Sequence, residues 1–393
     1  MLFTLIHKSV KMSTPSNGLS AKLLQVYMAN TTTSMLNNSQ QKLASTLGIS
    51  LPFIVFLALI GLVANLLICY IIFKKNELHT PTFYLMINMS VSHCLALVVS
   101  CCIIGLDYYL SSNPGISPLL IAFCKAFYCI NCTSYIVSTS TLTVISIERY
   151  LTILSASPLR NTLLNTSLKL KITIAFTWII GILMGWPNLI MVNILPRHPW
   201  VCNIGFVGAH FNLPYFISLL ILAFIIPSLI IGILYFKIVL FLRGKLINHQ
   251  ASHHNNVSFL RSRKRHLNTI KMLTFVTCGF MITCMPIFIT SLVIAWNAKN
   301  SVDFYISIGH TNTMVLLLGF LILIFSFIIN PLIYLYYNQS IRSSLPALFC
   351  QRCRKPVITV SLDNTSYNSK PTKVITVTSF NNFVVKNTSH ATL

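Results

Sequence analysis

The stretch Ile147-Glu148-Arg149-Tyr150 closes the third of seven long apolar segments and places a guanidinium close to membrane depth. Arginine keeps its proton there and is costly to place in lipid, so ionisable residues within membrane spans mark functional sites. Arg149 is therefore the first candidate functional residue, and the adjacent Glu148 supplies the opposite charge. The rest of the chain is best interpreted from this position outward.

The composition is that of a membrane protein. Of the 393 residues, 55% are apolar and only 8% are charged, whereas a soluble domain is usually about a quarter charged. Seven windows contain no Lys, Arg, Asp or Glu, and each is long enough for a helix to cross roughly 30 Å of hydrocarbon. These windows are Leu43–Phe73, Leu78–Leu106, Ala126–Ile147, Ile172–Pro196, His198–Phe236, Met272–Ala298 and Phe304–Ile341. The sequence predicts an all-α membrane protein, a seven-transmembrane helix bundle.

Basic residues predict the orientation. The loops after spans 1, 3 and 5, with their junctions, hold fourteen Lys and Arg, and the opposite loops hold three. Under the positive-inside rule the N-terminus is outside and the C-terminus is cytoplasmic. The net charge of +23 is thus divided among short loops instead of forming one basic face, which disfavours nucleic-acid binding.

Other function classes find little support. A transporter or channel needs polar residues along a continuous path, and no span interior carries an acid between Glu148 and Asp303. An enzyme is weaker still, because the spans offer no acid pair, metal constellation or positioned nucleophile. We therefore expect no catalytic residue, no metal and no cofactor.

The bundle is expected to be flanked by polar segments. Residues 1–46 form a flexible extracellular segment without a convincing signal peptide, 47–337 the bundle, 338–350 a short amphipathic helix and 351–393 a disordered cytoplasmic tail. The sequons at Asn30 and Asn37 lie outside and are glycosylation candidates. Of the twelve cysteines, only Cys124 and Cys202 face an oxidising compartment, so they are expected to form one disulfide.

Six of the seven spans carry marks that occur together in one family. They are Gly61-Leu-Val-Ala-Asn65, Glu148-Arg149-Tyr150 with Cys124, Trp178, Phe224-Ile-Ile-Pro227 with Tyr235, Phe280 with Pro286, and Asn330-Pro331-Leu-Ile-Tyr334. In this order and spacing the chain resembles a rhodopsin-like (class A) G-protein-coupled receptor from about Leu47 to Cys353. The resemblance implies a plasma-membrane receptor that transmits ligand binding to a heterotrimeric G protein. It also implies receptor kinases and arrestin as partners of the Ser/Thr-rich tail.

The resemblance assigns roles to these residues. The activation switch comprises Glu148, Arg149, Tyr150, Tyr235, Phe280, Pro286, Asn330, Pro331 and Tyr334. A polar core in the middle of the bundle comprises Asn65, His93 and Ser138. Buried amides are costly unless bonded, so Asn65 and Asn330 are expected to bond neighbouring helices. After Tyr334, residues 338–345 resemble the family's eighth helix, and Cys350 and Cys353 follow as candidates for palmitoylation or as unmodified thiols.

Several positions depart from the family's pattern. His93 replaces the usual aspartate of a sodium site, and an imidazole is a poor ligand for a hard cation, so weak or no sodium modulation is expected. A neutral, hydrogen-bonded His93 is favoured over a pH sensor. Cys284 replaces the usual tryptophan of span 6. The base of that span, 261–266, is basic throughout, so no acid there clasps Arg149 and elevated basal activity is expected. Loss of coupling, an uncoupled receptor-like protein, is the remaining alternative.

The ligand is constrained mainly by what is missing. Asn131 stands where amine receptors carry an aspartate, which disfavours an amine, and span 7 has no lysine for retinal. The outer acids Asp107 and Asp303 would meet a cationic peptide group or would be solvated helix-end charges. By resemblance, the pocket-facing positions are Asn131, Phe288, Ser291, Leu316 and Phe320.

Overall fold

The computed structural model describes residues 51–113, 115–154, 164, 166–195, 198–251, 257–308, 310–342, 358–361 and 374–377, and isolated residues before Leu51. Within these ranges the side chains of 245–270 and most of those of 305–320 are not described. The chain divides into two compact units, Met1–Asn338 and Gln339–Leu393.

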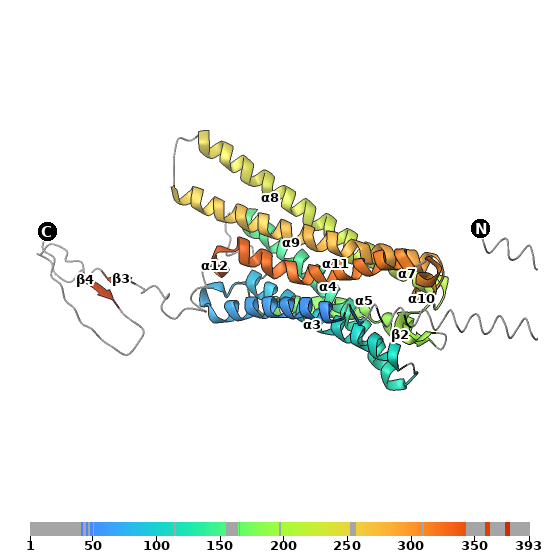
Figure 1. The fold of residues 1–393 in the computed structure, drawn as a ribbon. Coiled ribbons are helices and arrows are strands. Elements are labelled where there is room, and N and C mark those ends of the chain that lie inside the picture. Colours follow the sequence, from blue (N-terminus) through green and yellow to red (C-terminus); the bar gives the residue numbers. More distant parts are fainter. Residues whose placement is uncertain are drawn as a thin grey trace, which may run out of the picture. The chain divides into compact units, whose positions relative to one another are not determined.

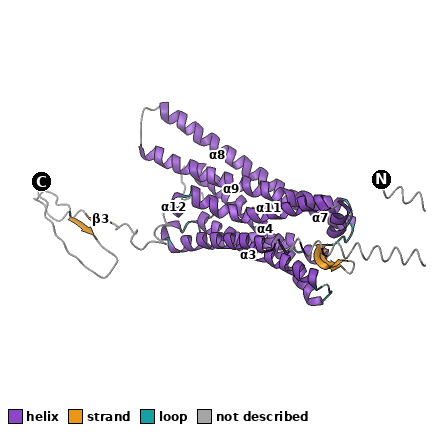
Figure 2. Ribbon diagram, viewed as in Figure 1, coloured by secondary structure: helices purple, strands orange, loops and turns teal. Residues whose placement is uncertain are grey.

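Long helices make up the first unit, as Figures 1 and 2 show. They are Leu51–Lys74, α3 (Pro81–Ser112), α4 (Pro118–Leu154), α5 (Ser167–Gly185), α7 (Ala209–Leu219), α8 (Ile226–Ala251), α9 (Val257–Trp296) and α11 (His310–Tyr337). The shorter helices are η1 (Asn76–Leu78), α6 (Asn188–Met191) and α10 (Ser301–Ile308). Helices α7 and α8 join through a π-helical turn, η2 (Leu220–Ile225), into one span.

Six of these helical segments are long and apolar enough to cross a membrane, among the residues described. The described apolar part of α11, Leu321–Tyr337, is shorter. As a whole, however, α11 has 28 residues, which at about 1.5 Å per residue exceeds the roughly 30 Å of hydrocarbon. The helices therefore agree with the predicted seven-span bundle.

Prolines lie at helix boundaries and inside the helices of spans 4 to 7. Pro187 caps α6 directly after α5 ends at Gly185. Pro227 follows the π-helical turn η2, where the wider turn accommodates the carbonyl that proline leaves without a donor. Pro286 and Pro331 lie inside α9 and α11.

Helix α4 is the central element and contacts α3, α5, α8 and α9. Its approach to α5 depends on two glycines. A Cβ on Gly185 would lie 2.6 Å from the Thr133 hydroxyl oxygen and 3.0 Å from the Cys129 carbonyl oxygen. Thr133 also donates a hydrogen bond to the Gly181 carbonyl at 3.2 Å. The small residues thus let the two helices pack with backbone atoms nearly in contact.

A two-stranded antiparallel hairpin follows α6. Strand β1 (Val192–Leu195) pairs with β2 (His198–Ile204), with Val192 opposite Ile204 and Asn193 opposite Asn203. Val192, Ile194 and Cys202 are buried against Leu110 of α3 and Cys124 of α4. The hairpin is therefore packed onto one end of the bundle through its own apolar face.

The second unit contains a short helix, α12 (Gln339–Arg342), and strands β3 (Ile358–Ser361) and β4 (Val374–Val377). Strands β3 and β4 pair antiparallel with Ile358 opposite Val377. The sequence predicts a tail without regular structure, and the structure differs in these two strands. Their β-branched residues are the type that favours extended pairing. The rest of the predicted amphipathic helix, beyond Arg342, lies outside the described residues.

Candidate functional site

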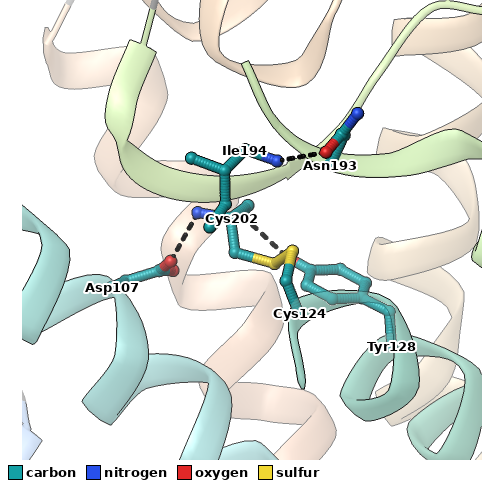
Figure 3. The surroundings of a disulfide bond; sticks show 6 residues. All are labelled: Asp107, Cys124, Tyr128, Asn193, Ile194 and Cys202. Carbon is teal, nitrogen blue, oxygen red and sulfur yellow. Dashed lines mark hydrogen bonds between the residues drawn. A yellow bond between two sulfur atoms is a disulfide. The ribbon is translucent and has the colours of Figure 1, made fainter. Parts of the chain in front are cut away.

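At one end of the bundle the predicted disulfide joins Cys124 of α4 to Cys202 of β2, with Cα atoms 5.8 Å apart, a distance typical of such bonds. Figure 3 shows that Cys202 also makes two hydrogen bonds to side chains of the bundle. The Cys202 N–H donates to the Asp107 carboxylate at 2.7 Å, and the Tyr128 hydroxyl donates to the Cys202 carbonyl at 3.4 Å. The disulfide prediction is confirmed, and the backbone N–H and C=O of Cys202 are bonded by side chains from α3 and α4, respectively.

Asp107 therefore has a structural partner that the sequence did not reveal. The sequence leaves it as a ligand contact or a solvated helix-end charge, but one carboxylate oxygen accepts the Cys202 N–H across 95 residues of sequence. This bond ties the Asp107 side chain of α3 to the hairpin. Asp303 is also engaged, since it accepts a hydrogen bond from the Asn300 amide at 3.0 Å.

Three of the predicted pocket positions lie on α4 and α9, and the other two lie on α11. The Asn131 amide donates to the Ser100 hydroxyl of α3 at 2.8 Å. The Phe288 ring meets Tyr135 edge-on at 5.2 Å and Phe224 at 5.6 Å. Ser291 is half-buried on α9. The side chains of Leu316 and Phe320 lie outside the described set.

An aromatic stack continues from this region toward the middle of the bundle. Tyr135 of α4 stacks on Phe280 of α9 with ring centroids 5.3 Å apart. Phe280 in turn lies 6.3 Å from the His93 ring, and His93 lies 5.2 Å from Phe327. Tyr135 was not predicted as a site residue from the sequence. It could have been, because it is an aromatic residue one helical turn after the pocket candidate Asn131 and therefore lies on the same face of the helix.

The predicted polar core is only partly connected. Asn65 donates to the carbonyls of Gly61 at 2.8 Å and Phe327 at 3.0 Å, so it bonds α11 as expected. His93 is buried, but among the described residues neither ring nitrogen has a hydrogen-bond partner. The structure therefore does not show the predicted hydrogen bond of His93. Its ring packs against aromatic faces instead.

Ser138 of the polar core bonds α3, whereas Asn330 of the activation switch lacks the expected bond to a neighbouring helix among the described residues. Ser138 pairs with the Ser92 hydroxyl at 2.8 Å and donates to the Ser134 carbonyl. The buried Asn330 amide has no hydrogen-bond partner among the described residues. Ser92 could have been proposed from the sequence because it lies next to His93. Its bond to Ser138 depends on how α3 and α4 pack.

At the other end of the bundle the arginine lies beside its expected companions. Arg149 interacts electrostatically with Glu148 and Tyr235, and its Nε is buried without a hydrogen-bond partner among the described atoms. The Tyr235 hydroxyl accepts a hydrogen bond from Ser146 at 2.8 Å. Tyr334 is 1% exposed, and its hydroxyl donates to the Met89 sulfur at 3.7 Å. Tyr150 is half-buried on the same turn as Arg149.

Other expectations lie outside the description. Asn30, Asn37, Cys350 and Cys353 are not among the described residues, nor are the side chains of the basic run 261–266. Among the described residues, no group of three or more His, Cys, Asp or Glu side chains is placed to hold a metal ion.

Comparison with known proteins gives the same architecture. The sequence profile of the 7 transmembrane receptor (rhodopsin family) matches residues 64–334. The neuropeptide Y receptor type 1 of Xenopus laevis is 28% identical over 319 residues, covering 76% of this chain and 82% of that receptor. The crystal structure of squid rhodopsin superposes with a TM-score of 0.63 at 21% identity, covering 78% of this chain and 85% of that one. The matching profile spans more than half of the chain, from the first helix to Tyr334, and so the protein belongs to the rhodopsin family of seven-transmembrane, G-protein-coupled receptors.

Proposed function

We propose that this plasma-membrane receptor is activated by an extracellular peptide and signals through Arg149 to a heterotrimeric G protein. The N-terminus is outside, because the basic residues lie overwhelmingly in the loops after spans 1, 3 and 5. The β1–β2 hairpin and its disulfide then face the ligand, and Arg149 faces the cytoplasm.

The peptide assignment is supported by the similar receptor and by the outer end of the bundle. The Xenopus laevis receptor that is 28% identical is named for a neuropeptide. In this chain position 131 of α4 is an asparagine, which has no carboxylate to hold an ammonium group. Its amide instead donates a hydrogen bond to Ser100. The nearby aromatic wall of Tyr135, Phe224 and Phe288 offers apolar contact area, which ligand sites use with few polar anchors.

One observation carries the signalling step, namely the buried Nε of Arg149 beside Glu148 and Tyr235. A guanidinium in this position is stabilised by whichever partners surround it, so two arrangements of similar energy are available. In the first, Arg149 stays with Glu148. In the second, the inner end of α9 has moved outward, and Tyr235 and Tyr334 support the arginine while a G-protein segment enters.

The test uses full-length receptor expressed with a panel of G-protein dissociation sensors. Neuropeptide Y is the first probe, followed by fractionated peptide extracts. We expect a peptide fraction to dissociate one class of G protein, and Arg149→Ala to abolish this response at equal surface expression. A response carried by amines or lipids alone would contradict the peptide assignment. An unchanged response in Arg149→Ala would contradict the signalling step.

Modifications complete the proposal. Asn30 and Asn37 carry glycans on the outer segment, and Cys350 or Cys353 carries a palmitoyl chain at the inner leaflet. The Ser/Thr-rich tail after Cys353 is phosphorylated by receptor kinases and then binds arrestin, because phosphates add charge that basic surfaces recognise. We assign no enzymatic activity to the chain.

A further inference from the structure

Four residues connect β2 to α7, and this linker is held at two points. Gly205 to Gly208 follow Ile204, and α7 begins at Ala209. Asn212, which is 2% exposed, donates to the Gly205 carbonyl at 2.9 Å and accepts the N–H groups of Val207 at 3.0 Å and Gly208 at 3.3 Å. The linker is thus fixed to the first turn of α7.

The second point of attachment comes from a different loop. Asn300 lies between α9, which ends at Trp296, and α10, which begins at Ser301. Its side-chain oxygen accepts the Phe206 N–H at 2.6 Å, and its amide nitrogen donates to Asp303 at 3.0 Å. An amide is suited to this position because it accepts from an N–H and donates to a carboxylate at the same time.

We propose that Asn300 is a positioning residue of an outer clasp, formed by Gly205–Gly208, Asn212, Asn300 and Asp303, which ties the outer ends of α7, α9 and α10 together and raises basal signalling. The proposal concerns regulation of the signalling step and rests on the proposed function. The clasp acts at the end of the bundle opposite to Arg149.

The shape of α9 transmits this restraint. The helix is continuous over its 40 residues, and Phe280 and Cys284 in its middle are 0% exposed. The ring of Tyr135 of α4 stacks on the ring of Phe280, so α9 is packed against α4 at the level of Phe280. Because α9 stays helical through Pro286, we infer that it tilts about this level as one body, so that holding its outer end toward the linker favours outward displacement of its inner end. The clasp therefore favours the same arrangement as an activating ligand.

The clasp is reversible, unlike the disulfide on the preceding strand β2. Cys202 is covalently bound to α4, whereas Phe206 is tied to the α9–α10 loop through one side chain. A tie of this strength shifts a two-state equilibrium by a few-fold and leaves room for a ligand to shift it further.

The experiment compares three full-length variants in lipid nanodiscs. Asn300→Ala removes both hydrogen bonds. Asn300→Asp keeps an acceptor for Phe206 but places a second carboxylate beside Asp303. The matched control is Asn297→Ala, because Asn297 is exposed in the same loop and, among the described residues, its side chain donates only to the Val293 carbonyl of its own helix at 2.8 Å.

Two readouts separate the clasp from the signalling proposal. Hydrogen exchange at the Phe206 amide should be about fivefold faster in Asn300→Ala, with faster exchange in the last turn of α9 as well. Basal nucleotide exchange on the G protein should fall about two- to fivefold in Asn300→Ala and in Asn300→Asp. Asn297→Ala should match the wild type in both measurements.

The outcomes are distinct. Unchanged hydrogen exchange in Asn300→Ala overturns the clasp. Faster exchange with unchanged basal signalling also overturns it, because the contact is then only structural. If no variant, including the wild type, activates any G protein, the proposed function fails. The clasp is then tested by hydrogen exchange in the last turn of α9 alone. An exchange rate in Asn300→Ala equal to that of the wild type overturns the clasp.

Discussion

The centroid of the His93 ring lies 6.3 Å from that of Phe280 and 5.2 Å from that of Phe327. This environment offers aromatic faces instead of the oxygen ligands that a hard cation requires. We expect basal nucleotide exchange in wild-type membranes to be the same in sodium chloride and in choline chloride. In the reciprocal variant, His93→Asp should introduce sodium dependence, because aspartate supplies the carboxylate oxygen ligands that histidine lacks. A wild-type receptor that sodium inhibits would refute this interpretation of position 93.

Asn65 gives a prediction about stability at the same scale. Its amide bonds its own helix and the Phe327 carbonyl of α11, and such interhelical bonds contribute about 0.6–2 kcal/mol within membranes. Asn65→Leu should lower the melting temperature of the purified receptor by about 2–4 °C. Asn113→Ala is the control, because Asn113 is exposed and donates only to the Tyr109 carbonyl one turn before it. Equal melting temperatures for the two variants would contradict the argument.

Among the elements, the contact of α4 with α5 is sensitive to a single methyl group. In Gly185→Ala the new Cβ would lie 2.6 Å from the Thr133 hydroxyl oxygen and 3.0 Å from the Cys129 carbonyl oxygen. The helices must then separate, at a cost of about 1–3 kcal/mol. Thermal unfolding should show a clear loss, and adding Thr133→Ala should restore only part of it because the backbone oxygen remains.

Gly232 of α8 provides the matched comparison, since none of the described atoms lies within 4 Å of a Cβ built there. Gly232→Ala should leave stability unchanged or raise it slightly, because alanine favours helix more than glycine does. If both glycine variants unfolded at the same temperature, close packing at Gly185 would not be the cause.

The positions of the helices were predictable from the sequence, but many contacts between them were not. Charge-free windows and prolines indicate spans because both follow from local chemistry. The disulfide was predictable because topology left only Cys124 and Cys202. By contrast, Asp107 bonds Cys202 through the packing of a distant loop, and the stack of Tyr135 on Phe280 depends on the rotation of two helices. Neither relation leaves a periodic or compositional signal.

For the whole molecule, the orientation can be tested together with glycosylation. An epitope placed before Asn30 should be stained on intact cells, and one after Cys353 should be stained only after permeabilisation. Asn30→Gln and Asn37→Gln should each remove a glycan, seen as faster migration in gels and loss of the shift produced by deglycosylation. Asn256→Gln alters a sequon that the positive-inside rule places in the cytoplasm. A change in the gel mobility of Asn256→Gln would contradict the predicted orientation, because it would show that Asn256 carries a glycan on the outside.

Signalling through the whole bundle should depend on which group donates a hydrogen bond to the Tyr235 hydroxyl. In the structure this hydroxyl accepts a hydrogen bond from Ser146 at 2.8 Å while Tyr235 lies within electrostatic range of Arg149. Tyr235→Phe removes a group that would support the arginine when α9 opens, a bond to a charged group worth about 1.5 kcal/mol or roughly tenfold. Peptide-stimulated and basal nucleotide exchange should fall by about that factor.

Ser146→Ala should act in the opposite direction, because it removes the hydroxyl that competes with Arg149 for Tyr235. Both positions are buried, so a simple loss of stability would lower signalling in both variants. The measurement is therefore G-protein dissociation normalised to surface expression, with the double variant included. If Ser146→Ala raises signalling only when Tyr235 is present, the two side chains act through the same hydroxyl. A parallel decrease in both single variants would show that the contact stabilises the bundle without taking part in the switch.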